Sequence, residues 1–586
     1  MWLMSYERRF RKAVTQTLSR SLRIRTPRND ALGGIYRGLR TRAACVAAFA
    51  LLLMVGGLAH AAGLQFEISF PATVHSHPIT GRVFVMISRR DDPAPRLQVG
   101  WWGDTPPFFA KDVARLTPGE AAVVDSSSPG YPLRSLKDLP AGEYYVQALI
   151  DIYTQFHRAD GHVIWAHMDH WEGQQFNQSP GNLYSPVEHI QLDPRSAQTV
   201  KLSLTKVIPP ITMPRDTVWV KHVKIESPLL TYFWGHPIYL GATVLLPKGY
   251  DTHPKVYYPV IYVQGHFGLS PPFGFTTQDR SSDGYDFYQA WNSANFPRMI
   301  AVRFQHPTPY FDDSYAVNSA NNGPYGDAIM KELIPYLEQH FRVIRQPYAR
   351  VLTGGSTGGW ESLALQIYHP RFFGGTWTFY PDPVDFRRFD LVDIYRDGNA
   401  FYEPGHHWLF PQRYIMRRSD GQPEVTEKEF SQLELALGSD GRSGQQLDAW
   451  DAVFGPVGAD GYPEPLWNKN TGKINHAVAD YMRSHGYDLR YYLRTHWTSI
   501  GPSLVGKLHV YVGDMDNYYL NLAVYLLQDY LAKTENPHYA GTFAYGRPMK
   551  GHGWQPMSNA ELVRMMAEHI ARHAPSGTNT RAWQYP

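Results

Sequence analysis

The sequence predicts an α/β protein: a doubly wound sheet, preceded by an N-terminal β-sandwich domain and interrupted by a large lid-like insertion. Three observations predict it. The first third of the chain has alternating strands without a helical period, and the remainder alternates continuous apolar strands with helices. One of those apolar strands, at residues 351–355, runs through the pattern Gly-x-Ser-x-Gly directly into a helix.

The amino terminus has the pattern of a targeting segment. Residues 1–42 hold eleven Lys or Arg against two acidic residues, and an uncharged apolar run follows at 43–62. A small-x-small site at 59–61 predicts a secretory signal over residues 1–61, cleaved after Ala61. We therefore expect an exported protein, periplasmic or secreted. An uncleaved anchor in the membrane is the alternative, because the run is just long enough to span a bilayer.

The remaining composition excludes several classes of function. The formal charge of the whole chain is +3, and without the basic leader the rest is near −6, which argues against nucleic acid as a partner. The single cysteine, Cys45, lies in the leader, so the mature chain offers no disulfide, cysteine ligand or cysteine nucleophile. At 586 residues the chain is too long for one core.

Residues 62–210 are predicted to form the β-sandwich domain. Alternating strands are expected at 65–70, 81–87, 143–150 and 199–204. Between 151 and 184 several histidines could suggest a metal site, but they lack a recognisable ligand spacing. No metal and no cofactor are expected anywhere in the chain.

Residues 216–586 are predicted to form the catalytic domain. After a strand hairpin at 218–250, the alternation comprises strands at 258–263, 299–304, 351–355, 375–383, 507–512 and 542–545, with helices at 327–341, from near Glu361, at 519–533 and at 559–573. An insertion at 386–505 interrupts it, with helices near 427–437 and 474–485. Such an insertion is expected to cover the site; the alternative is an elaborated surface without a role in chemistry.

Ser356 is the predicted nucleophile. A serine hydroxyl attacks only when it is held in the open beside a base, and a sharp strand-to-helix turn achieves this where its flanking positions are small. Gly354 and Gly358 meet that requirement.

A base and a carboxylate must accompany the serine, and open-sheet hydrolases present them in the order serine, acid, histidine. His552 stands in a Gly-flanked loop after the last strand and is the predicted base. Asp516 is the preferred acid, with Asp514 as the alternative, because both follow the strand at 507–512. The oxyanion donors are predicted to be the backbone N–H groups of Thr357 and His266, with that of Phe267 as the alternative to His266.

The sequence resembles the putative esterase family, which includes esterase D, enterochelin esterases, feruloyl esterases and mycolyltransferases. The resemblance rests on the segments 246–250, 260–266, 332–337, 354–359, 513–516 and 551–553, and covers roughly 240–385 and 500–573. It implies an α/β-hydrolase catalytic domain and a Ser-Asp-His triad at Ser356, Asp516 and His552.

The predicted function is an exported serine hydrolase that cleaves carboxylic esters through an acyl-enzyme. Its partner would be a small-molecule or glycan-linked ester, and a membrane would be involved only if the leader stays uncleaved. Three alternatives stay open: an acyltransferase, a peptidase on the same scaffold, or a non-catalytic glycan-binding protein. The sequence does not predict the oligomeric state.

Overall fold

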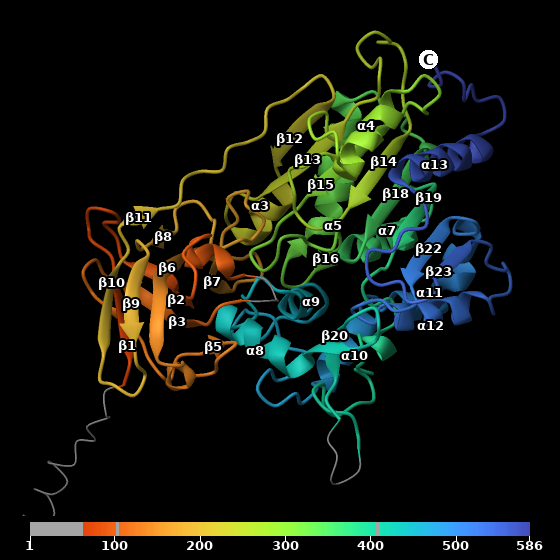
Figure 1. The fold of residues 1–586 in the computed structure, drawn as a ribbon. Helices are drawn as coiled ribbons and strands as arrows, with labels where there is room; N and C mark the ends of the chain where they lie inside the picture. The colour runs from red at the N-terminus through yellow and green to blue at the C-terminus, as the bar shows by residue number, and fades with distance from the viewer. Residues whose placement is uncertain (1–62, 101–104, 406–410, 586) are drawn as a thin grey trace, which may run out of the picture. The chain divides into compact units, whose positions relative to one another are not determined.

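The computed structural model describes residues 63–100, 105–405 and 411–585, and residues 62–586 form one compact unit (Figure 1). The predicted signal segment and Cys45 lie outside the described residues. Among those described, no helix combines the length and the apolar character that crossing a bilayer requires.

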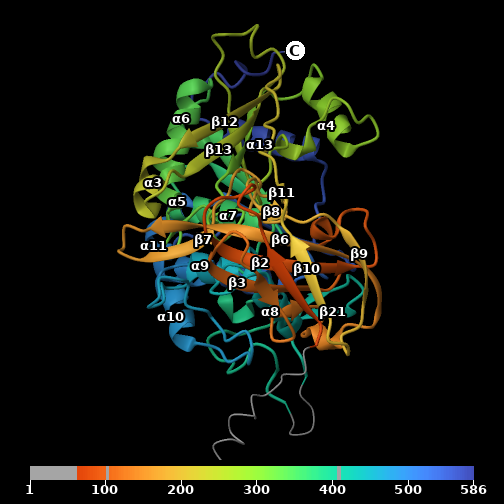
Figure 2. The same cartoon turned by 90° about the vertical axis from the view of Figure 1, so that its left-hand side faces the viewer.

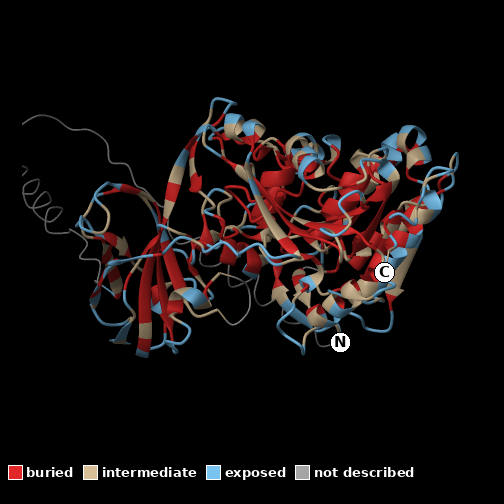
Figure 3. Ribbon diagram, turned by 90° about the horizontal axis from the view of Figure 1, so that it is seen from above, coloured by how far each residue is buried: buried red, intermediate tan, exposed pale blue. Residues whose placement is uncertain are grey.

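A mixed eight-stranded sheet forms the centre of the catalytic part. Its spatial order is β12 (Val220–Glu226), β13 (Tyr239–Leu245), β15 (Ile300–Gln305), β14 (Val260–Gln264), β18 (Arg350–Gly355), β19 (Gly375–Phe379), β22 (Leu508–Gly513) and β23 (Thr542–Gly546). From β15 to β23 all neighbours pair in parallel. The interior strands are buried on both faces, as the continuous apolar runs predicted (Figure 3).

The predicted α/β-hydrolase fold is confirmed by this arrangement. Because β14, β18, β19, β22 and β23 are parallel, their carboxyl ends meet at one edge of the sheet. Helices α7 (Thr357–Tyr368), α12 (Asn521–Leu531) and α13 (Asn559–His573) connect or follow these strands. The loops at that edge carry every residue for which the sequence predicts a catalytic role.

Two predicted elements differ in detail. The expected hairpin at 218–250 contains a helix, α3 (Pro228–Trp234), which begins with Ser227 as N-cap and Pro228 in its first turn and ends at the left-handed Gly235. The expected helix at 327–341 is three segments, α5 (Tyr325–Ala328), the π-helical η4 (Ile329–Leu333) and α6 (Ile334–His340). Pro335 has no N–H to donate to the preceding turn, which accounts for the widened segment.

The N-terminal domain holds two sheets, β10-β1-β4 and a second of eight strands with the path β11-β8-β6-β2-β3-β5, to which β7 and β9 add beside β6. The strands are β1 (Gln65–Ser69), β2 (Ile79–Ser88), β3 (Phe108–Leu116), β4 (Ala122–Val124), β5 (Gly130–Tyr131), β6 (Gly142–His157), β7 (Val163–His167), β8 (Leu183–Tyr184), β9 (Glu188–Leu192), β10 (Thr199–Ser203) and β11 (Lys206–Val207). Strands β3, β2 and β6 pair side by side (Figure 2). The domain boundaries themselves stay a prediction.

Strand β2 is buried on both faces, although its alternating sequence suggests one solvated face. Val83, Val85 and Ile87 pack in the domain's own core, against side chains of β1 and β10. Phe84 and Met86 point the other way, into a core shared with the insertion. The N-terminal domain and the insertion therefore share one hydrophobic core.

The described part of the insertion between β19 and β22 contains four α-helices. The predicted helices appear as α8 (Glu427–Leu437) and α10 (His476–Ser484). Two more, α9 (Gln446–Phe454) and α11 (Leu489–Ile500), were not predicted. A short hairpin, β20 (Tyr414–Arg417) with β21 (Pro423–Thr426), precedes α8 (Figure 1).

Candidate active site

Ser356 occupies a sharp turn between β18 and α7. Its backbone has φ 58° and ψ −125°, a left-handed value that is rare for a residue with a side chain. Helix α7 begins at Thr357, directly after the serine, rather than near Glu361 as predicted. The turn therefore leads straight from the strand into the first helical turn, whose N–H groups lack intrahelical partners.

Gly354 and Gly358 are required because the neighbouring backbone leaves no room for a side chain. A Cβ on Gly354 would lie 2.1 Å from the carbonyl oxygen of Gly358, and a Cβ on Gly358 would lie 2.3 Å from that of Gln264. Both contacts are with backbone, which cannot turn aside. The Gly-x-Ser-x-Gly spacing thus permits a packing of strand and helix that larger residues would prevent.

The structure brings Asp516 and His552 together. His552 Nδ1 lies 2.9 Å from Asp516 Oδ2. The other oxygen of Asp516 accepts N–H groups from Tyr518 at 2.9 Å and Leu520 at 3.3 Å, so the fully buried carboxylate is fixed at both ends. Asp516 can therefore hold the imidazole in one tautomer, with Nε2 available as a base.

Asp514 takes a different position. Its Oδ1 accepts the backbone N–H of Lys550 at 3.3 Å, and its own N–H donates to the carbonyl of Gly546. These contacts tie the loop after β22 to the loop after β23. Of the two aspartates, Asp516 is the one that contacts His552.

Asp382, which the sequence analysis did not single out, lies beside the nucleophile. The Ser356 hydroxyl donates to Asp382 Oδ1 at 3.4 Å, and the hydroxyls of Thr357 and Tyr315 donate to Oδ2 at 3.0 and 2.6 Å. Burial raises the pKa of Asp382, and these donors oppose the rise. Its place after β19, next to the nucleophile strand, was the signal available in the sequence.

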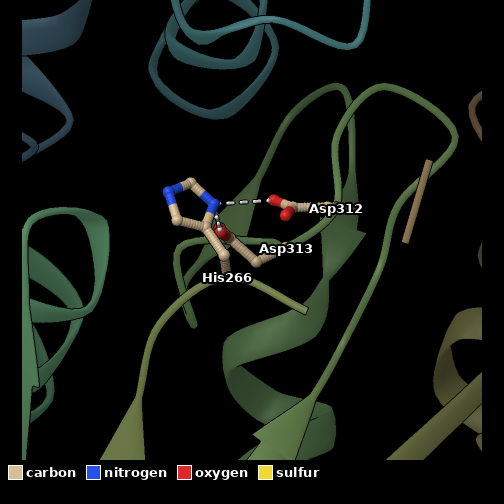
Figure 4. A group of neighbouring side chains, drawn as sticks. All are labelled: His266, Asp312 and Asp313. Atoms are coloured by element: carbon tan, nitrogen blue, oxygen red, sulfur yellow. Dashed lines mark hydrogen bonds and ion pairs between the residues drawn. The ribbon is translucent and has the colours of Figure 1, made fainter. Parts of the chain in front are cut away.

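His266 contributes a side chain as well as its backbone. Its Nδ1 lies 3.0 Å from Asp312 Oδ1 and 3.5 Å from Asp313 Oδ2 (Figure 4). Burial alone would lower its pKa, but the two carboxylates raise the pKa of His266 to about 10. The ring is therefore an imidazolium at neutral pH, and it is unsuited to act as the base.

Two groups of described side chains offer three metal-ligand atoms each: His266, Asp312 and Asp313, and His306, Asp313 and Glu361. The first is engaged in the ion pairs just described. In the second, His306 Nδ1 accepts the backbone N–H of Ser314 at 3.0 Å, and burial lowers the pKa of His306 to about 4. The neutral ring consequently carries its proton on Nε2, which faces Glu361 at 3.8 Å. At 3.8 Å the two groups form no hydrogen bond, and a protonated Nε2 is not a metal ligand.

Ser356, His552, His266 and Asp382 line one cavity of about 370 Å³. The insertion supplies four further lining residues: Asp390, Ile415, Gln446 and Trp450. The His552 ring packs against the rings of Tyr380 and Tyr518, with centroids 4.6 and 4.7 Å away. Ser356 and His552 thus share a partly apolar cavity with residues of the insertion, while the oxyanion role of the Thr357 and His266 N–H groups stays a prediction.

Comparison with known proteins gives one family. Residues 239–406 match the family described as "Putative esterase". No match was found among the curated proteins.

Solved structures give low-scoring matches. A ferulic acid esterase aligns with a TM-score of 0.33 at 15% identity, over 60% of this chain and 98% of its own. The fluorophosphonate-binding serine hydrolase F of Staphylococcus aureus has a TM-score of 0.31 at 14% identity, over 60% and 98%. An S-formylglutathione hydrolase from Agrobacterium tumefaciens has 0.31 at 11% identity, over 61% and 96%.

Proposed function

We propose that this chain, whose residues 239–406 match the putative esterase family, hydrolyses carboxylic esters through an acyl-enzyme on Ser356. One observation carries the proposal. A serine in a strained strand-to-helix turn lines the same cavity as a histidine that is held, through Nδ1, by a buried aspartate. That combination is the machinery of serine acyl transfer.

We infer the following first half-reaction. His552 Nε2 takes the proton of Ser356 Oγ as the oxygen attacks the acyl carbon, and Asp516 stabilises the imidazolium that forms. The negative charge that develops on the carbonyl oxygen is met by the N–H groups of Thr357 and His266. The alcohol then leaves with the proton from His552, and water repeats the sequence to release the acid.

Asp382 affects the orientation of the Ser356 hydroxyl before the attack. Because the Ser356 hydroxyl donates to Asp382, the attack requires its proton to turn from that carboxylate toward His552. The bond is long, at 3.4 Å, so a rotation about the Cα–Cβ bond of the serine can break it at little expense.

The protein is further proposed to be exported, on the strength of the basic segment 1–42 and the apolar run 43–62. Its site of action would be the periplasm or the medium. Amino-terminal sequencing of the mature protein tests this, with cleavage after Ala61 expected and an intact leader favouring the membrane anchor.

A fluorophosphonate probe tests the nucleophile directly. We expect the full chain to be labelled and to hydrolyse p-nitrophenyl acetate, and Ser356→Ala to lose both properties while its circular dichroism is unchanged. Ser499→Ala is the matched control, since Ser499 is exposed on α11. Labelling that persists in Ser356→Ala would show that another residue is the nucleophile.

An added acceptor separates hydrolysis from acyl transfer. With butanol or an amine present, a hydrolase releases acid as its main product, whereas an acyltransferase forms the new ester or amide in excess. The same assay with a peptide substrate tests the peptidase alternative.

A further inference from the structure

Asp390 is an unusual residue in the wall of the catalytic cavity. It lies in the tight turn from Phe389 to Val392, whose N–H and C=O groups exchange hydrogen bonds of 2.9 and 3.0 Å. Its φ is 53°, a left-handed value that aspartate tolerates better than most residues. Turns are normally exposed, yet Asp390 is only 1% exposed and lines the cavity.

The carboxylate of Asp390 has no partner among the described residues. Neither oxygen accepts a hydrogen bond, and no lysine, arginine or histidine forms an ion pair with it. An aspartate in a turn usually accepts an N–H from its own backbone two residues later, but this one does not. The carboxyl group of Asp390 therefore stabilises neither the turn nor the core. A buried carboxyl without a partner is instead destabilising.

The charges around Asp390 are of its own sign. Burial, together with the carboxyl groups of Glu427, Asp382 and Asp516, holds the pKa of Asp390 well above its usual range. Glu427 likewise has two buried oxygens without a hydrogen bond. The imidazolium in the same cavity, His266, is paired with Asp312 and Asp313, so among the described residues no cation favours the ionised form of Asp390.

Apart from Gln446, Asp382 and the predicted catalytic residues, the walls of the cavity are mainly aromatic and aliphatic. Trp450, Tyr380 and Tyr518 contribute rings, and Ile415 and Leu520 contribute aliphatic surface. Aromatic rings and a carboxyl group in one cavity suit a positively charged ammonium group, which can gain cation–π attraction as well as an ion pair. An anionic group would be repelled there, and a purely apolar group would leave Asp390 buried without a partner.

We propose that Asp390 binds a positively charged ammonium group of the substrate, so that the site prefers cationic esters to neutral esters of the same shape. The inference rests on the proposed esterase function for its chemistry. A bound cation would favour the ionised form of Asp390 and supply its missing partner. Asp390 is then a specificity residue that the insertion contributes to a site otherwise built by the sheet.

Two pairs of isosteric esters test the preference. Acetylcholine is compared with 3,3-dimethylbutyl acetate, and p-nitrophenyl 4-(trimethylammonio)butanoate with p-nitrophenyl 5,5-dimethylhexanoate. We expect kcat/KM to favour the cationic member at least tenfold in one pair, and the pair concerned identifies the half of the ester that meets Asp390. Equal rates in both pairs would overturn the proposal.

The variant Asp390→Asn keeps the shape of the side chain and suits the left-handed turn. We expect its preference to fall below about threefold, because an amide cannot pair with the cation. Asp480→Asn, an exposed aspartate of the insertion, is the matched control and should keep the wild-type ratio. A ratio unchanged in Asp390→Asn would assign the preference to another residue and contradict the proposal.

A binding measurement keeps this test separate from the test of turnover. Titration calorimetry of the wild-type full chain with tetramethylammonium chloride, against sodium chloride, should show saturable heat that Asp390→Asn loses. If no ester is hydrolysed but this binding persists, the esterase proposal fails while the cation site stands. Absence of binding together with hydrolysis of neutral esters leaves the esterase and refutes the cation site.

Discussion

At the scale of single residues, the site is defined by which carboxylate meets which imidazole. Asp516 contacts His552, whereas Asp312 and Asp313 contact His266. The two histidines therefore have different tasks in one cavity. His266 is held as a cation by two carboxylates, and His552 is held through Nδ1 by Asp516.

The contrast between the two aspartates after β22 gives the first prediction. Asp516→Asn presents an amide to His552 Nδ1 and favours the wrong tautomer, so kcat for p-nitrophenyl butyrate should fall by roughly 10³–10⁴. Asp514→Asn should lower kcat less than about tenfold, because its carboxylate accepts only a loop N–H. A larger loss in Asp514→Asn would reassign the acid.

The ion pairs of His266 predict a pH dependence of stability. The pKa of this ring is about 10 in the folded protein and about 6.5 in the unfolded chain, so folding favours its protonated form. Its contribution is complete below pH 6.5 and is lost as the pH rises toward 10.

Urea unfolding of wild type and His266→Gln over this range measures the effect. The difference in unfolding free energy should be constant at acidic pH and should shrink steadily between about pH 6.5 and 10. A difference that does not vary with pH would show that the ring stabilises the fold by packing alone.

At the scale of elements, the insertion builds part of the cavity, and one buried lysine fixes its geometry. Lys469 forms ion pairs with Glu434 on α8 and Asp448 on α9. Helix α9 in turn carries Gln446 and Trp450 into the cavity. The orientation of these two side chains therefore depends on a charge network outside the site.

Replacing that lysine tests the dependence. Lys469→Met leaves two buried carboxylates without their cation, which should lower the free energy of unfolding by about 3 kcal/mol. The variant should also lose kcat/KM, because α9 shifts in the cavity wall. Lys473→Met, an exposed lysine nearby, should change stability by less than about 0.5 kcal/mol. Full stability in Lys469→Met would mean that packing alone holds α9.

At the scale of the whole molecule, the N-terminal domain and the insertion are joined by a shared core and by Arg82. This guanidinium, on β2, donates to the carbonyl oxygens of Leu435 and Ala436 in the last turn of α8, at 3.0 to 3.2 Å. It also pairs with Asp112 at 2.6 Å. A cation at the carboxyl end of a helix is favourable. Arg82 therefore stabilises the junction both through these hydrogen bonds and through its charge at the end of α8.

Arg82→Met should weaken the junction. The variant keeps an unbranched apolar stem but removes the donors to the α8 carbonyl groups, while Asp112 keeps Arg442 and Ser439 as partners. We therefore expect the free energy of unfolding to fall by about 2 kcal/mol. Calorimetry should show a lower Tm, and proteolysis in the exposed linker at 209–217 should be faster. Arg134→Met, exposed on the same domain, is the control; equal behaviour of the two variants would contradict the inferred role of the junction.

Local rules were enough for much of the fold. Continuous apolar runs predict β14, β15, β18 and β22, because a strand that is buried on both faces consists mainly of apolar residues. Helix α8 matches its predicted bounds, and its threonine and glutamate form the capping box that marks such a start. The gaps have equally physical causes: α9 and α11 lie in a segment where aromatic and polar residues mask the helical period.

The sequence by itself determined the nucleophile turn, the alternation of buried strands with helices and the short set of candidate residues, since glycine spacing and hydrophobic runs act over a few neighbouring positions. Only the tertiary structure decided between Asp514 and Asp516, placed Asp382 beside the serine and brought Asp390 into the cavity wall. Those outcomes depend on contacts between segments tens to hundreds of residues apart, and such contacts arise only when the insertion, the sheet edge and the loops pack together.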